Sequence, residues 1–188
     1  YVNGVIAALV SESGVLGVSG PVEAGDAKLY VDGFEIGAKA AREDVVVNIS
    51  YTGSFSDVSL MAAAAETHMG AGADILTGSS QSVVGAISVA KENNGYWFGT
   101  QWNQTDLAPE AVYASQVYDW SGIIVDMIEA HKAGVMGGKA YTLTFANGGL
   151  KIEYNPAMDV PAEGMDAADA AIQGIIDGEV DPLAIPAS

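Results

Sequence analysis

The apolar residues of this chain follow two alternating patterns. Short runs rich in β-branched and aromatic residues recur, each bounded by Gly, Asn, Asp or Ser, and such runs are typical of buried strands. We expect five of these strands, at 15–19, 45–50, 73–76, 96–98 and 112–117. The segments between them place apolar residues three or four positions apart, which predicts amphipathic helices at 27–42, 58–69, 82–92 and 119–132. Strands that alternate with helices predict an α/β fold with a parallel sheet flanked by helices.

Two helices near the start of the chain allow more detailed predictions. The first, at 3–13, should end at Gly14, because Gly favours the position that follows a helix. In the second, the apolar stripe includes Leu29, Gly33 and Gly37. We expect the two glycines to permit close approach of this helix to the sheet.

The C-terminal part departs from the alternation. Its first helix should turn four large apolar side chains inward, those of Ile123, Ile124, Met127 and Ile128. Two alternating segments then flank Asn147-Gly148-Gly149, which predicts a β-hairpin of residues 140–145 and 150–154. A final helix is expected at 166–176, closed by Gly178.

Composition limits the classes of protein to consider. The chain has 188 residues, of which 49% are hydrophobic and 16% charged, as in a globular protein. No apolar run reaches the ~20 residues that span a bilayer. A net charge of -17 should repel nucleic acid, and the absence of Cys leaves no thiolate chemistry. The chain begins at Tyr1 without Met, so either a leader was removed or the sequence starts inside a longer protein. Because the chain opens within an expected helix, we expect the second.

Four expected strand-to-helix loops should share one edge of the sheet, where ligands of open α/β sheets bind. They are residues 19–26, 51–57, 77–81 and 99–105. In the last loop, the amides of Gln101 and Asn103 flank Trp102. An indole can stack on a ring while amides bond to its edge, so this loop suits a flat, polar, uncharged molecule. The alternative is a polar loop with a half-buried Trp.

The other loops contribute further candidate ligand residues, each with a structural alternative. Phe55 could contact a ligand or pack under the next helix. Asp57 could bind a ligand or cap that helix, which is the safer interpretation. Ser79, Ser80 and Gln81 could bind a carbonyl or hydroxyl group, and either serine could be the N-cap of the helix that follows.

Catalytic and metal-binding groups are hard to assemble. We interpret His68 and His131 as surface histidines far from the four loops, because a catalytic base must reach its substrate. No spacing of His, Asp and Glu fits a metal site. The sequence therefore predicts a binding protein with no catalytic residue, metal or cofactor.

Three motifs resemble those of a known family. They are Gly-Phe-Glu-Ile-Gly-Ala-Lys at 33–39, Tyr-Thr-Gly-Ser-Phe-Ser-Asp at 51–57 and Gly-Ala-Asp at 72–74. Their order and spacing resemble the basic membrane protein (BMP) family of solute-binding lipoproteins, which includes the purine nucleoside receptor of ABC importers. The resemblance runs from Tyr1 to about Glu179.

The resemblance implies the type I periplasmic-binding-protein fold, in which two α/β lobes close on a ligand. Residues 1–14 would then end the first lobe, 15–105 would form the second, 106–139 would return toward the first, and 140–188 would form the hairpin and C-terminal helix. The partners implied are a small solute, which in the family is a nucleoside stacked on an aromatic from each lobe, and a transporter permease. The location implied is periplasmic or extracytoplasmic, with a lipid anchor as the only membrane attachment. Phe55 matches the aromatic of the second lobe.

Two positions depart from the family pattern. The family's fourth strand usually ends Gly-Val-Asp-Ser-Asp-Gln, with an Asp that holds ribose; here Gln101 replaces that Asp. Tyr118 replaces a Lys that often follows the fifth strand. A neutral amide accepts hydroxyl hydrogen bonds less strongly than a carboxylate, so a nucleobase-like solute fits as well as a nucleoside.

The function expected is that of the substrate-binding component of an ABC importer. One alternative is the ligand-sensing domain of a transcription regulator. Another is a nucleoside-processing enzyme, whose acid or base would have to come from Glu23, Asp26 or Asp57.

Overall fold

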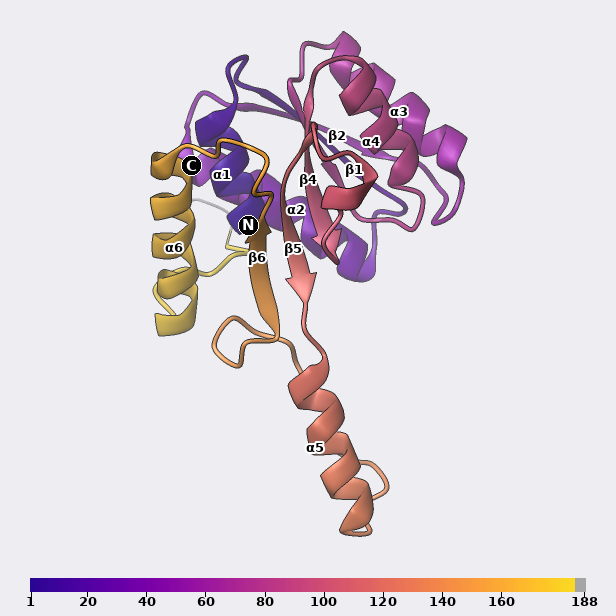
Figure 1. Ribbon diagram of the computed structural model, residues 1–188, viewed down its shortest axis with the longest axis vertical. Coiled ribbons are helices and arrows are strands. Elements are labelled where there is room, and N and C mark those ends of the chain that lie inside the picture. The colour runs from indigo at the N-terminus through magenta and orange to yellow at the C-terminus, as the bar shows by residue number, and fades with distance from the viewer. Residues whose placement is uncertain (185–188) are drawn as a thin grey trace.

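The computed structural model, which describes residues 1–184, has one six-stranded sheet with helices on both faces (Figure 1). The strands lie in the order β2-β1-β3-β4-β5-β6; all neighbours are parallel except β5 and β6. This confirms the predicted α/β fold. In chain order the elements are α1 (Val2–Val10), β1 (Val15–Gly20), α2 (Gly25–Ala41), β2 (Val46–Tyr51), α3 (Val58–Gly70), β3 (Ile75–Gly78), α4 (Val84–Glu92), β4 (Tyr96–Gln101), η1 (Thr105–Leu107), β5 (Val112–Tyr118), α5 (Ser121–Lys132), β6 (Leu150–Tyr154) and α6 (Ala162–Asp177).

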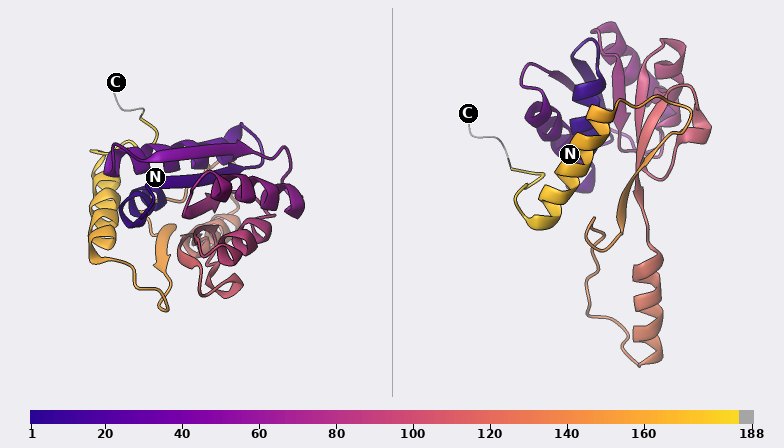
Figure 2. Two further views of the ribbon diagram at one scale, coloured as in Figure 1. Left: turned by 90° about the horizontal axis from the view of Figure 1, so that it is seen from above. Right: turned by 60° about the vertical axis from the view of Figure 1, so that its left-hand side comes forward.

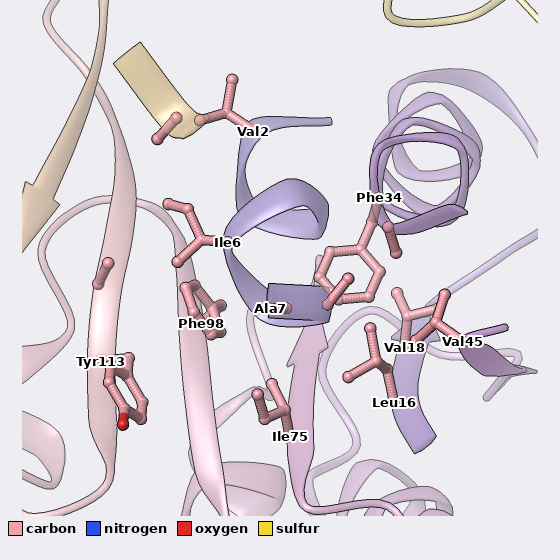
Figure 3. Packing of buried hydrophobic residues seen from close by; sticks show 14 of the residues in the cluster. Val2, Ile6, Ala7, Leu16, Val18, Phe34, Val45, Ile75, Phe98 and Tyr113 are labelled. Atoms are coloured by element: carbon pink, nitrogen blue, oxygen red, sulfur yellow. The ribbon is translucent and has the colours of Figure 1, made fainter. Parts of the chain in front are cut away.

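The hydrophobic core has two layers, one on each face of the sheet. Neighbouring residues of β4 enter different layers, because successive side chains of a strand point to opposite faces. Trp97 packs with the residues of α3 and α4, whereas Phe98 packs with those of α1, α2 and α6. Figure 3 shows Phe98 beside Ile6 of α1 in the second layer, and Figure 2 shows the helices on either side of the sheet. Burial on both faces explains why the central strands read as continuous apolar runs.

Helix α1 ends earlier than the sequence predicts. It stops at Val10, and the next residue is already extended, so the prediction that Gly14 ends it is wrong. The carboxylate of Asp74 accepts hydrogen bonds from the Ser11 hydroxyl and from the backbone N–H groups of Glu12 and Ser13, at 2.6, 2.7 and 2.9 Å. These tertiary bonds hold the chain out of the helix before Gly14 is reached.

The glycines of α2 face another helix rather than the sheet. A Cβ atom on Gly37 would collide with the backbone carbonyl of Tyr1, and one on Gly4 of α1 would collide with that of Phe34. The two helices are therefore in backbone contact, and the prediction that α2 approaches the sheet through its glycines is wrong. Leu29 is half-exposed, so it does not belong to the buried stripe as predicted.

The C-terminal part differs most from expectation. Residues 140–145 form no strand, and β6 pairs with β5 instead, so the predicted hairpin is wrong. Helix α5 projects away from the body, and within residues 1–184 it buries none of its side chains (Figures 1 and 2). Its isoleucines and methionine therefore do not face inward in this structure. Gly178 closes α6 with a left-handed backbone, as predicted.

Candidate ligand-binding edge

The four predicted loops lie together at the carboxyl ends of β1 to β4, as expected. The Ser79 N–H donates to the Ser19 carbonyl at 3.1 Å, which joins the first and third loops. The Gln81 N–H donates to the Phe55 carbonyl at 3.1 Å, which joins the second and third. The hydroxyl of Thr100 donates to the Gly78 carbonyl at 3.0 Å, which joins the fourth loop to β3. Two backbone hydrogen bonds and one from the Thr100 side chain thus join the loops into one continuous edge.

The loop after β4 is fixed from within by Gln104, which is only 1% exposed. Its side-chain oxygen accepts from the Trp97 indole N–H at 2.7 Å, and its amide donates to the Thr100 carbonyl at 2.8 Å. Its backbone N–H donates to the hydroxyl of Ser115 at 3.1 Å. Gln104 therefore positions the loop and has little capacity left for a ligand.

Gln101 and Trp102 stand at the tip of this loop, and both are exposed. Gln101 has a φ of 71°, a left-handed conformation that is uncommon for residues with a side chain. The Trp102 N–H donates to the Thr100 carbonyl at 2.9 Å, so Gln101 is the centre of a tight three-residue turn of the rarer, strained type. The turn presents the Gln101 amide to solvent, and that amide makes no hydrogen bond within residues 1–184.

The loop after β2 carries Phe55 and Asp57. Half of the Phe55 surface is exposed, so the ring is not packed under α3. The Asp57 carboxylate accepts from the backbone N–H groups of Ser59 and Leu60, at 2.9 and 3.1 Å, and thereby caps α3. The expectation that Asp57 is an N-cap is confirmed.

The serines of the third loop do not cap α4 as predicted. That helix begins at Val84, after a turn, and has no side-chain cap among the described residues. Ser80 is buried, and its hydroxyl bonds to the Phe55 carbonyl at 2.9 Å and to the hydroxyl of Ser82. The Ser79 and Gln81 side chains remain accessible.

Asn103 is the least available of the predicted amides. Its NH₂ group donates to a carboxylate oxygen of Glu153 at 2.8 Å, and its oxygen accepts from the Thr105 N–H at 3.0 Å. The side chain thus connects the loop to β6, a contact far away in the sequence.

A hollow of about 280 Å³ opens between the third and fourth loops. It is lined by Ser80, Gln81, Val83, Val84, Thr100, Gln101, Trp102, Gln104 and Leu107. A larger hollow of about 600 Å³ follows α2 on the outside of the molecule and is bordered by the ion pairs Lys28–Asp32 and Lys39–Glu35. The smaller hollow lies where open α/β sheets bind ligands.

A buried polar network supports β4 immediately behind this edge, and the sequence analysis did not predict it. The Asn3 amide donates to the Tyr30 hydroxyl and to the Gly99 carbonyl, both at 3.1 Å. Because the Thr77 hydroxyl donates to the Phe98 carbonyl at 2.7 Å, Tyr30 must donate to Thr77. Burial raises the pKa of Tyr30 to about 12, so the network stays neutral at physiological pH. An asparagine within an otherwise apolar helix was the one signal available.

The two histidines lie away from the edge. His131 is exposed, as predicted. His68 is 3% exposed and packs against Gly17 of β1, so its interpretation as a surface histidine is wrong. Within residues 1–184 there is no cluster of three or more His, Cys, Asp and Glu residues that could hold a metal ion.

The sequence model of the family described as "ABC transporter substrate-binding protein PnrA-like" matches residues 1–177, and the chain belongs to this family. It is 32% identical over 186 residues to basic membrane protein A of Borreliella afzelii, covering 96% of this chain and 57% of that protein. It is 27% identical over 186 residues to a purine-binding protein of Brucella abortus, covering 99% and 52%. The chain thus spans little more than half the length of these relatives.

Solved structures confirm the fold. A solute-binding protein of an ABC transporter system from Conexibacter woesei superposes with a TM-score of 0.80 at 21% identity, covering 96% of this chain and 61% of that one. A structure titled as a transcriptional activator of the comK gene from Bacillus halodurans gives the same TM-score and identity, with 97% and 63% covered. The fold therefore does not by itself distinguish transport from regulation. No helix in residues 1–184 combines the length and the apolar character needed to cross a bilayer.

Proposed function

We propose that this chain forms one side of the binding site of an ABC importer's substrate-binding protein and that it binds a small heteroaromatic solute, a nucleoside or a nucleobase-like molecule. The observation that carries the proposal is the pair of half-exposed aromatic residues, Phe55 and Trp102, at the carboxyl edge of the sheet. Exposed rings beside free amide and hydroxyl groups are suited to stacking on a flat, polar ligand. The purine-binding relative from Brucella abortus supports this ligand class.

Of the eight ligand residues predicted, five are the main contacts in this proposal. Phe55 and Trp102 would stack on the ligand, and Gln101, Gln81 and Ser79 would bond to its edge. Asp57, Ser80 and Asn103 would act mainly through the loops that they already hold in place.

Closure by a second lobe would complete the site. The exposed apolar residues of α5 are a surface that a packed lobe could cover, since large exposed apolar patches mark interaction sites. The chain also spans little more than half of its relatives' length. In this proposal the two lobes close around a hinge on one solute, and a permease receives it on the extracytoplasmic side of a membrane to which a lipid anchor ties the protein.

No catalytic step is part of the proposal. The family description is that of a substrate-binding protein. At the edge, Asp57 already accepts two backbone hydrogen bonds as a helix cap. His68 of α3 is buried against β1, out of a substrate's reach.

Calorimetric titration of the full-length protein with adenosine and adenine tests the proposal. Phe55→Ala and Trp102→Ala should each weaken binding about tenfold or more, since an aromatic stack contributes roughly 1–3 kcal/mol. Leu29→Ala, an equally exposed position on the outside of α2, is the matched control and should leave affinity unchanged. If Phe55→Ala instead unfolds the protein while the folded fraction binds normally, Phe55 is a structural residue and the proposed site is wrong.

A further inference from the structure

We infer that the hollow beside β4 selects uncharged planar heterocycles whose edge carries a hydrogen-bond donor next to an acceptor, and that the Gln101 amide recognises this edge. The inference rests on the proposed function and specifies the ligand class of the same site. Three independent features of the chain support it: the neutral lining of the hollow, the pairing of the chain's cations, and the strained turn at Gln101.

The lining of the hollow carries no ionisable side chain among the residues that the structure describes. Its inner polar groups are already satisfied: Thr100 donates to Gly78, and Gln104 bonds to Trp97 and to the Thr100 carbonyl. The polar side chains left for a ligand are the amides of Gln101 and Gln81, beside the indole of Trp102. Such a set can satisfy a neutral polar edge but offers no counter-charge.

The rest of the chain does not supply a cation either. Each of its seven Lys and Arg residues lies within 4.0 Å of a carboxylate oxygen of Asp or Glu. The net charge is -17, so the surrounding field repels anions. A phosphorylated ligand would therefore lose its hydration at this site without gaining an ionic partner from this chain.

Gln101 adopts a backbone conformation that glycine would adopt with less strain. The left-handed φ of 71° is one of only two positive φ values among non-glycine residues 1–184, the other being that of Asn94. Strained residues persist where the surrounding structure over-determines them, and they cluster at ligand sites. A Gln amide places a donor beside an acceptor and pairs in bidentate fashion with adenine, whose N6 donates and N7 accepts.

The test uses the Gln101→Gly variant of the full-length protein, in which the left-handed turn is retained and the amide removed. Titration with adenine and with unsubstituted purine, which lacks the amino donor, measures the recognition of the edge. The wild type should bind adenine about tenfold more tightly than purine, and the variant should lose that preference. Urea unfolding should show a higher midpoint for the variant, because strain is relieved. Asn94→Gly, which changes the other strained position in the turn before β4, should leave the preference at wild-type strength.

Comparing adenosine with AMP isolates the effect of charge, because the two differ only by the phosphate. AMP should bind at least a hundredfold more weakly. Equal adenine preference in Gln101→Gly and wild type, or AMP affinity within threefold of adenosine, would overturn the inference while leaving the proposed function intact. Failure of the wild type to bind adenine, adenosine or purine would instead overturn the proposed function, and the inference with it.

Discussion

His68 is a buried titratable group that the proposed site does not use. Its ring packs beside Gly17, where α3 crosses β1, and its Nε2 atom has no hydrogen-bond partner within residues 1–184. Burial lowers the pKa of His68 below 6.5, and the neighbouring Val18 backbone only partly opposes this. The native state therefore favours the neutral ring.

Protonation of His68 should make folding stability depend on pH. As the pH falls below 6.5, His68 takes up a proton in the unfolded chain before it does so in the native chain. The free energy of unfolding therefore decreases with falling pH until the pH lies below the native pKa of His68. Urea unfolding of the wild type and His68→Leu between pH 7.5 and about 5 measures the effect, and the wild type should lose more stability than the variant. The exposed control, His131→Leu, should follow the wild type. Parallel curves for wild type and His68→Leu would contradict the prediction.

The burial of His68 could have been predicted from the sequence, whereas the roles of Asn103 and Gln104 could not. The buried residues of α3 are Met61, Ala65 and His68, at helical spacings of four and three. In an Ala-rich helix this stripe contrasts weakly with the other faces. By contrast, Gln104 and Asn103 are occupied by Ser115 and Glu153, which are distant in sequence. Pattern alone cannot reveal such partners.

At the scale of elements, α3 depends on a cap that belongs to the ligand edge. Asp57→Ala removes the acceptor of two backbone N–H groups and should lower the free energy of unfolding by about 1 kcal/mol. Asp57→Asn should restore most of that loss, because Asn caps helices equally well. Chemical denaturation compares the three proteins. If Asp57→Asn is as unstable as Asp57→Ala, the charge rather than the cap stabilises this loop.

Elements buried on both sides were predicted well, and elements whose ends depend on tertiary contacts were not. The central strands β1, β3 and β4 are recognisable because both of their faces require apolar residues. Helix α1 ends early because Asp74 binds the residues that follow it. The predicted hairpin around Asn147 fails because β6 pairs with β5, and the Asn147 side chain instead closes a local turn by accepting from the N–H groups of Thr144 and Gly149. The Asn147-Gly148-Gly149 motif therefore correctly marked a turn, but residues 140–145 before it form no strand.

At the scale of the whole molecule, the body and the α5 projection differ in how they contribute to stability. The body buries Ile6 completely between α1 and the sheet, whereas Ile128 of α5 is 48% exposed. The apolar face of α5 therefore contributes little to the folding of this chain, although its composition is that of a buried helix. The proposed second lobe accounts for this difference, because it would cover α5 only in the complete protein.

Substitution of Ile128, on the apolar face of α5, tests whether a second lobe covers this helix in the complete protein. In the 188-residue chain, Ile128→Lys should change the free energy of unfolding by no more than about 0.5 kcal/mol, as for a surface position. Ile6→Ala, the control for a packed residue, should lower it by about 2–5 kcal/mol. In the full-length protein, Ile128→Lys should become destabilising by at least about 2 kcal/mol, because a lobe packed on α5 would bury the new charge unpaired. Urea unfolding of both lengths of chain measures the contrast. An equally small effect in the full-length protein would mean that no lobe covers this face, and the two-lobe arrangement proposed for the site would then be wrong.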